Sequence, residues 1–386
     1  MMADLTYREI ARILDDGDVA GRLGRDDLPT PALLLDLDLF ERNIRRMVDW
    51  CRTNKRQLRP HGKTHKCPEV ARALIKAGAV GACVAKLAEA EVFAAHGVTG
   101  LLVTTPVVGR HKIERAIELS RKHPDTLWVV DDAGNAADLN ATAGVQGVRL
   151  EILIDVRVGK RGGVQPGLPA LKLAQTIVSL PNLHLCGMQA YAGNVSHVIG
   201  FSERKRASEA AMDEALATRR LWEEHGIACP LLTGGSTGTY NIDSGIAGIS
   251  ELQPGSFIFM DRDYEAVGGV GGATYDDFAP ALSVLTTVVS RPSNELAVVD
   301  GGTKTFSTDR PLVPVATGGR GMTYDWAGDE HGRLRCPDGN APAIGTHIEF
   351  NIPHCDPTVN LHDRMYCLRG DRVEAVWRIA ARGMSQ

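Results

Sequence analysis

The feature that most constrains the fold is a regular alternation of short apolar runs and helix-like segments between residues 57 and 260. Such alternation is typical of βα units that form a parallel sheet. The expected strands are 57–60, 80–84, 100–104, 126–130, 148–155, 183–191, 229–233 and 251–260. About eight such units over roughly 220 residues are what a TIM (β/α)8 barrel requires, although a doubly wound open sheet would alternate in the same way.

Segments of helical periodicity separate these runs. In the stretch 39–51, for example, apolar residues recur on one helical face and charged residues occupy the other. The expected helices are 5–14, 39–51, 69–77, 87–96, 110–122, 168–179, 203–225 and 240–246, and a further apolar strand, 32–36, follows two prolines.

The character of the chain changes after residue 265. Glycines become dense at 268–272, helical periodicity ends, and β-rich runs follow at 281–290, 295–299, 345–351, 365–369 and 372–379. The sequence therefore predicts an α/β protein in three parts. These are an N-terminal helix and extended arm (1–31) that packs with the β domain, a TIM barrel (32–265), and a mostly β C-terminal domain (266–386).

Composition narrows the class of function. The formal net charge of −4 argues against a nucleic-acid binder, which usually shows a basic excess or stripe. The first residues lack an apolar core behind a basic flank, so neither a secretory signal nor a membrane anchor is expected. Eight cysteines without paired spacing suit reduced thiols. We therefore expect a cytoplasmic protein that acts on small molecules.

Two lysines and two histidines gather at one predicted strand-to-helix turn, in the run RPHGKTHK at 59–66. Ligands of α/β barrels bind at the carboxyl ends of the strands. A lysine at this turn is therefore well placed as a nucleophilic amine toward a carbonyl compound. The alternative is a basic loop on the surface.

A second informative run is LLTGGSTGTY at 231–240, which follows a strand and leads into a helix. Glycines let backbone N–H groups converge, and the hydroxyls add donors at a helix N-terminus, where the dipole favours an anion. The run predicts a phosphate site without the lysine of a P-loop. The alternative is a flexible Gly/Ser turn.

Two other loops follow strands in the same way. The run DVRVGKRGGV at 155–164 offers three basic residues, of which Arg161 stands beside glycines and can approach a planar ligand closely. The run QAYAGNVSH at 189–197 supplies the phenol of Tyr191 and the imidazole of His197. Single Tyr and His residues more often serve packing, but these belong to the same predicted face of the barrel.

The β domain contains the run IPHCDPTVNLHD at 352–363. If this segment is extended, His354 and Asp356 point the same way and Cys355 points oppositely. Imidazole with carboxylate fits a borderline or hard divalent cation, whereas imidazole with thiolate would favour zinc. The alternative is a polar turn between prolines.

Together with LPTP at 28–31, these runs resemble the D-threonine aldolase and D-serine dehydratase family, pyridoxal-phosphate enzymes in which a barrel precedes a β domain. The runs span nearly the whole chain in the family's order. The resemblance implies that Lys63 is the Schiff-base lysine, with Lys66 and Lys160 as competitors. It also implies roles for Arg161 and Tyr191 at the cofactor, Gly234, Gly235, Ser236 and Thr237 at its phosphate, His197 beside the substrate, and His354 and Asp356 at a metal.

The resemblance also bears on the reaction. In the family that this chain resembles, dehydratases carry a His-x-Cys pair that holds zinc, whereas aldolases carry a His-x-Asp pair that holds Mg²⁺ or Mn²⁺. Asp356 therefore favours an aldolase. The expected substrate is 3-hydroxyaspartate, cleaved to glycine and glyoxylate, with Arg320, or less strongly Arg310, reading its distal carboxylate. Cleavage of D-threonine, dehydration of D-serine or 3-hydroxyaspartate, and racemisation are the alternatives. A homodimer is also expected.

Overall fold

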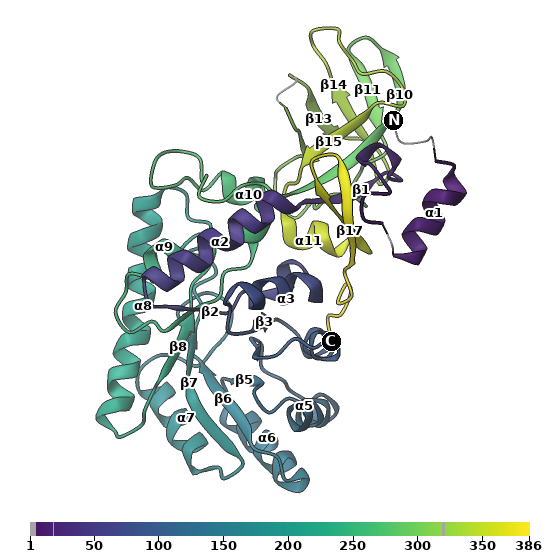
Figure 1. Cartoon of the computed structure of the whole chain (residues 1–386). Helices are drawn as coiled ribbons and strands as arrows, with labels where there is room; N and C mark the ends of the chain where they lie inside the picture. The colour runs from purple at the N-terminus through teal and green to yellow at the C-terminus, as the bar shows by residue number, and fades with distance from the viewer. Residues whose placement is uncertain (1–4, 18, 319–320) are drawn as a thin grey trace.

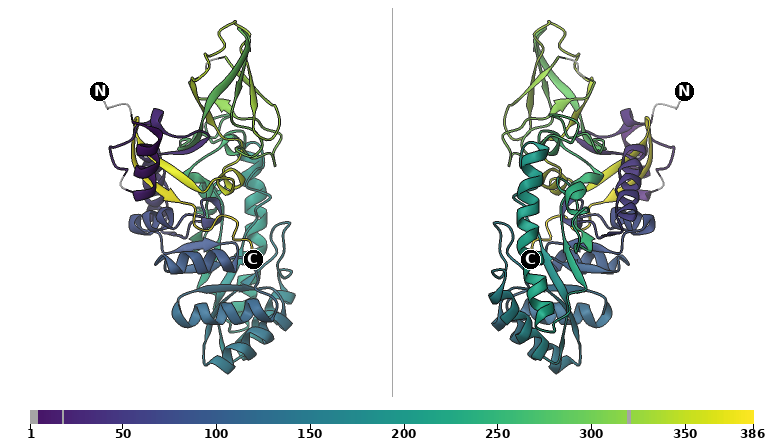
Figure 2. Two further views of the ribbon diagram at one scale, coloured as in Figure 1. Left: turned by 90° about the vertical axis from the view of Figure 1, so that its right-hand side faces the viewer. Right: turned by 90° about the vertical axis from the view of Figure 1, so that its left-hand side faces the viewer.

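The computed structural model describes residues 5–17, 19–318 and 321–386, which form an elongated molecule with a barrel at one end and a β domain at the other (Figures 1 and 2). Eight parallel strands pair in the order β2-β9-β8-β7-β6-β5-β4-β3. A parallel bridge between His61 and Cys83 joins β2 to β3, so the sheet closes into a barrel and the open-sheet alternative is excluded. The strands are β2 Gln57–Leu58, β3 Ala82–Val84, β4 Leu101–Val103, β5 Leu127–Val130, β6 Leu150–Asp155, β7 Leu183–Ala190, β8 Leu231–Gly234 and β9 Glu251–Leu252.

Helices connect the strands and cover the barrel (Figure 1). They are α2 Leu37–Thr53, α3 Pro68–Ala77, α4 Leu87–Ala95, α5 Arg110–Lys122, α6 Ala133–Gln146, α7 Leu168–Ser179, α8 Phe201–Glu224 and α9 Tyr240–Asp243. The helix α6 lies outside the segments expected from periodicity. It begins at an Asp132 cap, whose side chain accepts a hydrogen bond from the backbone N–H of Asn135 at 2.9 Å. Its alanines and glycines give little amphipathic contrast, which explains why periodicity does not reveal it.

The second sheet forms the β domain, with the path β13-β14-β11-β10-β1-β16-β17, with β15 paired to β10 and with β12 paired to β15. Its strands are β1 Ala32–Asp36, β10 Leu282–Ser293, β11 Leu296–Val299, β12 Val315–Ala316, β13 Thr323–Trp326, β14 Gly332–Arg335, β15 His347–Asn351, β16 Arg364–Arg369 and β17 Arg372–Arg378.

One strand belongs to a different sheet than expected. The strand β1 pairs antiparallel with β10 and parallel with β16, so it lies in the β domain and the barrel begins at β2. Residues Ala32 to Leu35 are all buried. A strand that is apolar on both faces suits the interior of either sheet, and its pattern therefore cannot identify the sheet to which it belongs.

The N-terminal arm packs on the β domain. The helix α1 Tyr7–Asp16 starts with a capping box between Thr6 and Glu9. Apolar side chains of the arm share a buried cluster with the β domain, formed by Ile13, Val19, Leu23, Leu28, Ala32, Leu34, Leu285, Tyr366, Leu368 and Val373.

The segment expected as a strand at 251–260 is mostly not a strand. Only Glu251 and Leu252 pair, and a short 3₁₀ turn follows at Ser256–Ile258. The carbonyl of Pro254 accepts a hydrogen bond from His61 N–H at 3.0 Å, and a Cβ on Gly255 would lie 2.4 Å from Thr64 Oγ1. The chain therefore bends beneath the lysine loop instead of continuing the sheet. None of the described helices has the length and apolar character that a membrane crossing needs.

Candidate active site

One cavity of about 470 Å³ collects the predicted functional side chains. It opens where the barrel strands end and the β domain begins, the usual position of a barrel's active site. The predicted residues that line it are Lys63, Arg161, Tyr191, His197, Ser236, Thr237, His354 and Asp356. Gly234 and Gly235 are not among the lining residues, because they form the end of β8 and the turn that leads to Ser236. A wider surface groove of about 630 Å³ contains none of these residues.

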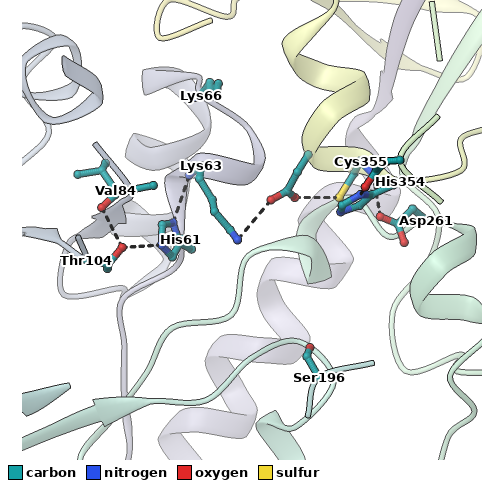
Figure 3. A network of polar contacts seen from close by, with 12 residues as sticks. His61, Lys63, Lys66, Val84, Thr104, Ser196, Asp261, His354 and Cys355 are labelled. Atoms are coloured by element: carbon teal, nitrogen blue, oxygen red, sulfur yellow. Dashed lines mark hydrogen bonds and ion pairs between the residues drawn. The ribbon is translucent and has the colours of Figure 1, made fainter. Parts of the chain in front are cut away.

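The loop that carries Lys63 is tightly packed. Lys63 lies in the 3₁₀ turn Gly62–Thr64, and its backbone N–H donates to His61 Nδ1 at 3.3 Å. A Cβ on Gly62 would lie 2.6 Å from the Phe93 ring, so this position requires glycine. In Figure 3 the Lys63 side chain leaves this loop and points toward the helix α11 that carries Cys355. The packing fixes the backbone at Lys63, while the amine of the side chain extends into the cavity.

The charge of Lys63 is matched by a carboxylate from the other domain. Its Nζ lies 3.7 Å from Asp356 Oδ2. Attraction to Asp356 raises the pKa of Lys63 above its ordinary value, against the effect of burial and of nearby Arg161, which lower it. The lysine is therefore held as an ammonium ion until another group engages Asp356 or the amine itself.

The two competing lysines differ in position. Lys66 forms an ion pair with the buried Glu89, it is not among the residues that line the cavity, and Figure 3 shows it on the far side of the loop from His61. Lys160 lines the cavity together with Lys63. Among these three lysines, Lys63 and Lys160 therefore reach a ligand in the cavity.

Arg161 and Tyr191 form a flat, charged edge of the site. The guanidinium carbon of Arg161 lies 5.8 Å from the centre of the Tyr191 ring. Its Nη2 donates to the carbonyl of Thr104 at 3.3 Å and lies 3.8 Å from Asp155 Oδ2. Asp155 is buried and receives a hydrogen bond from Gln189 Nε2 at 2.8 Å. These contacts orient a planar cation beside the cavity.

His61 is a cavity residue that the sequence did not single out. Its Nε2 lies 3.1 Å from Thr104 Oγ1. Burial, together with the nearby charges of Lys63 and Arg161, lowers its pKa well below the ordinary value, so the ring is neutral. The second histidine of the loop, His65, stacks on Phe93 in the core, with ring centres 5.7 Å apart. The sequence shows both histidines but not which of them faces the ligand.

The glycine-rich run contributes Ser236 and Thr237 to the cavity, which Gly255 and Ser256 also line. Gly235 has a φ of +74°, a left-handed conformation that favours glycine, and a Cβ there would lie 2.9 Å from Leu252. Thr239 does not line the cavity, because its hydroxyl donates to the buried Asp243 at 2.5 Å and also lies 3.0 Å from Ser236 Oγ. Hydroxyls and close backbone in a space too small for larger side chains fit a phosphate group.

The cavity as a whole fits pyridoxal phosphate. It offers an amine at Lys63, a permanently charged planar donor at Arg161, the aromatic ring of Tyr191 and the hydroxyl pair Ser236 and Thr237. These groups are matched to an aldehyde, a heteroaromatic ring and a phosphate.

His197 lies beside a carboxylate that the sequence did not identify. Its Nδ1 lies 3.1 Å from Asp263 Oδ2, and the same oxygen lies 3.0 Å from Nε of Arg310. Burial raises the pKa of Asp263, but the contacts with His197 and Arg310 outweigh it and lower the pKa below its ordinary value. The His197 ring also packs on Tyr264, with centres 4.6 Å apart. Asp263 is therefore an ionised group in close contact with both a histidine and an arginine.

The expected metal ligands do not lie on an extended segment. His354 caps the short helix α11 Cys355–Asn360, and Asp356 stands in its first turn. The backbone N–H of Cys355 donates to the buried Asp261 at 2.8 Å, and this bond anchors the turn. The expectation of an extended segment is therefore wrong, but the start of the helix still brings His354 and Asp356 to the same cavity.

The donor set at this helix fits a hard divalent cation. His354 Nδ1 lies 2.7 Å from Asp309 Oδ2, which leaves Nε2 as the nitrogen that can bind a metal. The other ligand, Asp356, is ionised. Burial opposes this ionisation, but Lys63 and His354 outweigh it and lower the pKa of Asp356. Two protein ligands suit an ion that keeps several water or substrate oxygens, as Mg²⁺ does. Arg310 lines the cavity, whereas Arg320 lies outside the described residues.

Comparison with known proteins agrees with this arrangement. The family "Alanine racemase, N-terminal domain" matches residues 35–263, and the family "Putative serine dehydratase domain" matches residues 281–368. The chain is 37% identical to D-threonine aldolase of an Arthrobacter species over 92% of this chain and 93% of that protein. It is also 37% identical to 3-hydroxy-D-aspartate aldolase of Paracoccus denitrificans strain Pd 1222, over 95% and 96%.

Solved structures of the same family resemble this chain over most of its length. The D-threonine aldolase from Filomicrobium marinum superposes with a TM-score of 0.91 at 37% identity, covering 95% of this chain and 99% of that one. The D-threo-3-hydroxyaspartate dehydratase from Delftia sp. HT23 superposes with a TM-score of 0.82 at 28% identity, covering 92% and 98%. The chain therefore belongs to the family of D-threonine aldolase and 3-hydroxy-D-aspartate aldolase, pyridoxal-phosphate-dependent lyases with the alanine-racemase-like fold.

Proposed function

We propose that this protein is an aldolase that depends on pyridoxal phosphate and a divalent metal, and that it cleaves a β-hydroxy-D-amino acid reversibly. The proposed substrate is 3-hydroxyaspartate, which gives glycine and glyoxylate. The observation that carries the proposal is the approach of Lys63 Nζ to Asp356 Oδ2, at 3.7 Å, in the cavity that His197 and His354 also line. An amine, an imidazole and a metal-type ligand pair in one cavity are the groups that a retro-aldol cleavage requires.

Lys63, Arg161, Tyr191, Ser236 and Thr237 are the residues that would hold pyridoxal phosphate. When bound, this group supplies an electron sink for the electron pair left on Cα as the Cα–Cβ bond breaks. Arg161 keeps its proton at any working pH and therefore cannot transfer it to a ring nitrogen. Such a site strengthens the sink less than a carboxylic acid partner would, which disfavours transamination, the side reaction that needs electron density to move from Cα onto the cofactor.

His354 and Asp356 would hold Mg²⁺ or Mn²⁺, with Asp309 in contact with the His354 ring. A divalent ion bound there would lower the pKa of the substrate's β-hydroxyl group. The proposal of an oxygen-preferring metal is supported by the carboxylate at position 356, since a thiolate there would favour zinc.

His197 is the proposed base for the β-hydroxyl proton. Asp263 Oδ2 lies 3.1 Å from its Nδ1, so Nε2 is the nitrogen left to accept the proton. Lys63 is the proposed acid that returns a proton to Cα of glycine, because its amine reaches into the same cavity. In this scheme Asp263 positions the base and compensates the charge that the ring gains.

The substrate carboxylate requires a cation, because an unpaired carboxylate in a closed site is costly. Arg310 lines the cavity and its side chain is 37% exposed, so it has solvent-facing donors beyond its contact with Asp263. We propose Arg310 as the described residue that reads the distal carboxylate of 3-hydroxyaspartate, with Arg320 as the second candidate. The homodimer and the cytoplasmic location expected from the sequence also remain predictions.

The test is a product assay with the holoenzyme and Mn²⁺. D-3-hydroxyaspartate should give glycine and glyoxylate, and D-threonine should give glycine and acetaldehyde at lower catalytic efficiency. Oxaloacetate and ammonia from 3-hydroxyaspartate would instead indicate dehydration, the activity named for the Delftia relative. Interconversion of amino-acid enantiomers without carbon–carbon cleavage would indicate a racemase.

A further inference from the structure

A second group of metal-binding side chains lies at the other end of the barrel. Within the described part of the chain, Glu151, His184 and Cys186 are the one set of three His, Cys, Asp or Glu residues whose donor atoms all lie within 4.8 Å of one another. Glu151 belongs to the start of β6, and His184 and Cys186 to the start of β7. Parallel barrel strands carry their catalytic residues at the carboxyl ends, so this group lies apart from the cavity described above.

Strand pairing brings the three side chains together. Glu151 and His184 are direct partners in the register of β6 and β7. The register then shifts, because β7 carries one extra residue, Cys186, between the partners of Ile152 and Leu153. A bulge of this kind re-aims side chains. The Cys186 side chain packs beside the buried cluster that contains Leu153, so the thiol is fixed on one side by the core.

The three donors are in contact already. Glu151 Oε2 accepts from Cys186 Sγ at 2.8 Å and lies 2.6 Å from His184 Nδ1, while Sγ lies 3.6 Å from Nδ1. Ligands that share a tetrahedral zinc ion, at about 2.0–2.3 Å from it, lie roughly 3.3–3.8 Å apart. The sulfur–nitrogen distance already meets this requirement. Glu151 would need to withdraw by about 1 Å, and its partly exposed side chain leaves room for that movement.

We propose that Glu151, His184 and Cys186 form a zinc site at the amino-terminal mouth of the barrel, separate from the catalytic cavity. Thiolate and imidazole ligands select zinc over magnesium or manganese, and three protein ligands leave a fourth position for water. Zinc takes the place of the thiol proton, which is released to solvent when the Zn–S bond forms. The ion would fasten β6 to β7 where the bulge interrupts their pairing. The exposed Arg149 is a nearby positive charge, and it would weaken the binding of the cation by repulsion.

The test uses cobalt as a spectroscopic probe of the holoenzyme. Co²⁺ should produce a thiolate-to-metal charge-transfer band. The spectrum of the cofactor-loaded protein without cobalt is subtracted to remove the absorption of the cofactor. Zn²⁺ should abolish the band by displacing Co²⁺. Cys186→Ser should remove the band, and His184→Ala should weaken zinc binding by more than about tenfold, since even outer-shell changes cost that much. Two controls should keep it: Cys229→Ser, a buried thiol near the same end of the barrel, and Cys355→Ser, beside Asp356.

A stability measurement provides an independent readout. Zinc should raise the thermal midpoint of the wild-type holoenzyme and leave that of Cys186→Ser unchanged, because an ion that binds only the folded state stabilises it. If Cys186→Ser does not fold, Glu151→Gln replaces it, since this change keeps the shape and removes the charge. A wild-type protein without a charge-transfer band at saturating cobalt, or a band that persists in Cys186→Ser, would overturn the proposal and leave a hydrogen-bonded cluster only.

Discussion

Lys63 and Asp356 come from different domains, yet the amine Nζ of one lies 3.7 Å from the carboxylate Oδ2 of the other. The lysine lies after β2 of the barrel, and the aspartate lies in the first turn of α11 in the β domain. The contact couples the proposed cofactor lysine to the proposed metal ligand. A cation bound to Asp356 would weaken the attraction that keeps Lys63 protonated, so occupancy of the metal site should favour the reactive, neutral amine.

The first prediction concerns Lys63. Lys63→Ala should remove both the activity and the visible absorption that a lysine-bound pyridoxal phosphate gives, because the Lys63 amine lies beside Asp356 in the cavity, whereas Lys66 is paired with Glu89 outside it. Lys160→Ala is the matched control, since Lys160 lines the same cavity. We expect it to keep the absorption. Peptide mapping after borohydride reduction checks the assignment directly, and a label on Lys160 or Lys66 would contradict it.

The second prediction concerns the pH dependence of the lysine. The Asp356 carboxylate raises the pKa of Lys63 by favouring its charged form. Asp356→Asn should therefore lower that pKa, and the rate at which the metal-free apoprotein takes up pyridoxal phosphate should rise at a lower pH than in the wild type. Asp309→Asn is the control, because Asp309 contacts His354 instead. An unshifted profile in Asp356→Asn would show that the carboxylate does not control the amine.

The third prediction concerns metal removal. Exhaustive chelation should abolish cleavage while the cofactor absorption remains, because the proposed ligand pair His354 and Asp356 would serve the β-hydroxyl group and not the cofactor. Mg²⁺ or Mn²⁺ should restore activity. Restoration by zinc alone, with keto-acid products, would instead support the dehydratase reading. Asp356→Cys sharpens the test, since it creates the His-x-Cys pair.

The fourth prediction separates the base from the residue that orients it. His197→Ala should lower kcat by about 10²–10⁴-fold, the usual contribution of a general base. Asp263→Asn should lower kcat less and alter its pH profile, because the imidazole remains but loses the ionised partner 3.1 Å away. The double variant should be little worse than His197→Ala alone, since the two residues act as one unit. Additive losses would assign Asp263 an independent role.

Much of this architecture could be predicted from the sequence. The alternation of apolar and helical segments indicated the barrel, and the lysine, arginine and Gly/Ser runs after its strands identified residues that share one cavity. The sequence could not show that β1 belongs to the β domain, because a strand that is apolar on both faces fits either sheet. The places of Asp263 and His61 in the site could not be predicted for a different reason. Their roles depend on contacts between segments far apart in the chain, such as His61 with Thr104 and Asp263 with His197.

The fifth prediction concerns substrate choice. 3-Hydroxyaspartate carries a second carboxylate where threonine has a methyl group, so an enzyme that prefers it must supply a cation. Arg310 contacts Asp263 through Nε at 3.0 Å, and a substrate carboxylate could use the remaining guanidinium donors without breaking this contact. Removing a hydrogen bond to a charged group costs about 1.5–3 kcal/mol, which is roughly a ten- to hundredfold loss.

Arg310→Ala should therefore lower kcat/KM for D-3-hydroxyaspartate by roughly ten- to hundredfold and change kcat/KM for D-threonine much less. Arg310→Lys should recover part of the loss, because it restores the charge without the planar fork. Arg320→Ala, measured in parallel on both substrates, tests the second candidate. An equal loss on both substrates in Arg310→Ala would mean that the arginine acts through Asp263 and His197 and does not read the substrate, since that route is common to both reactions.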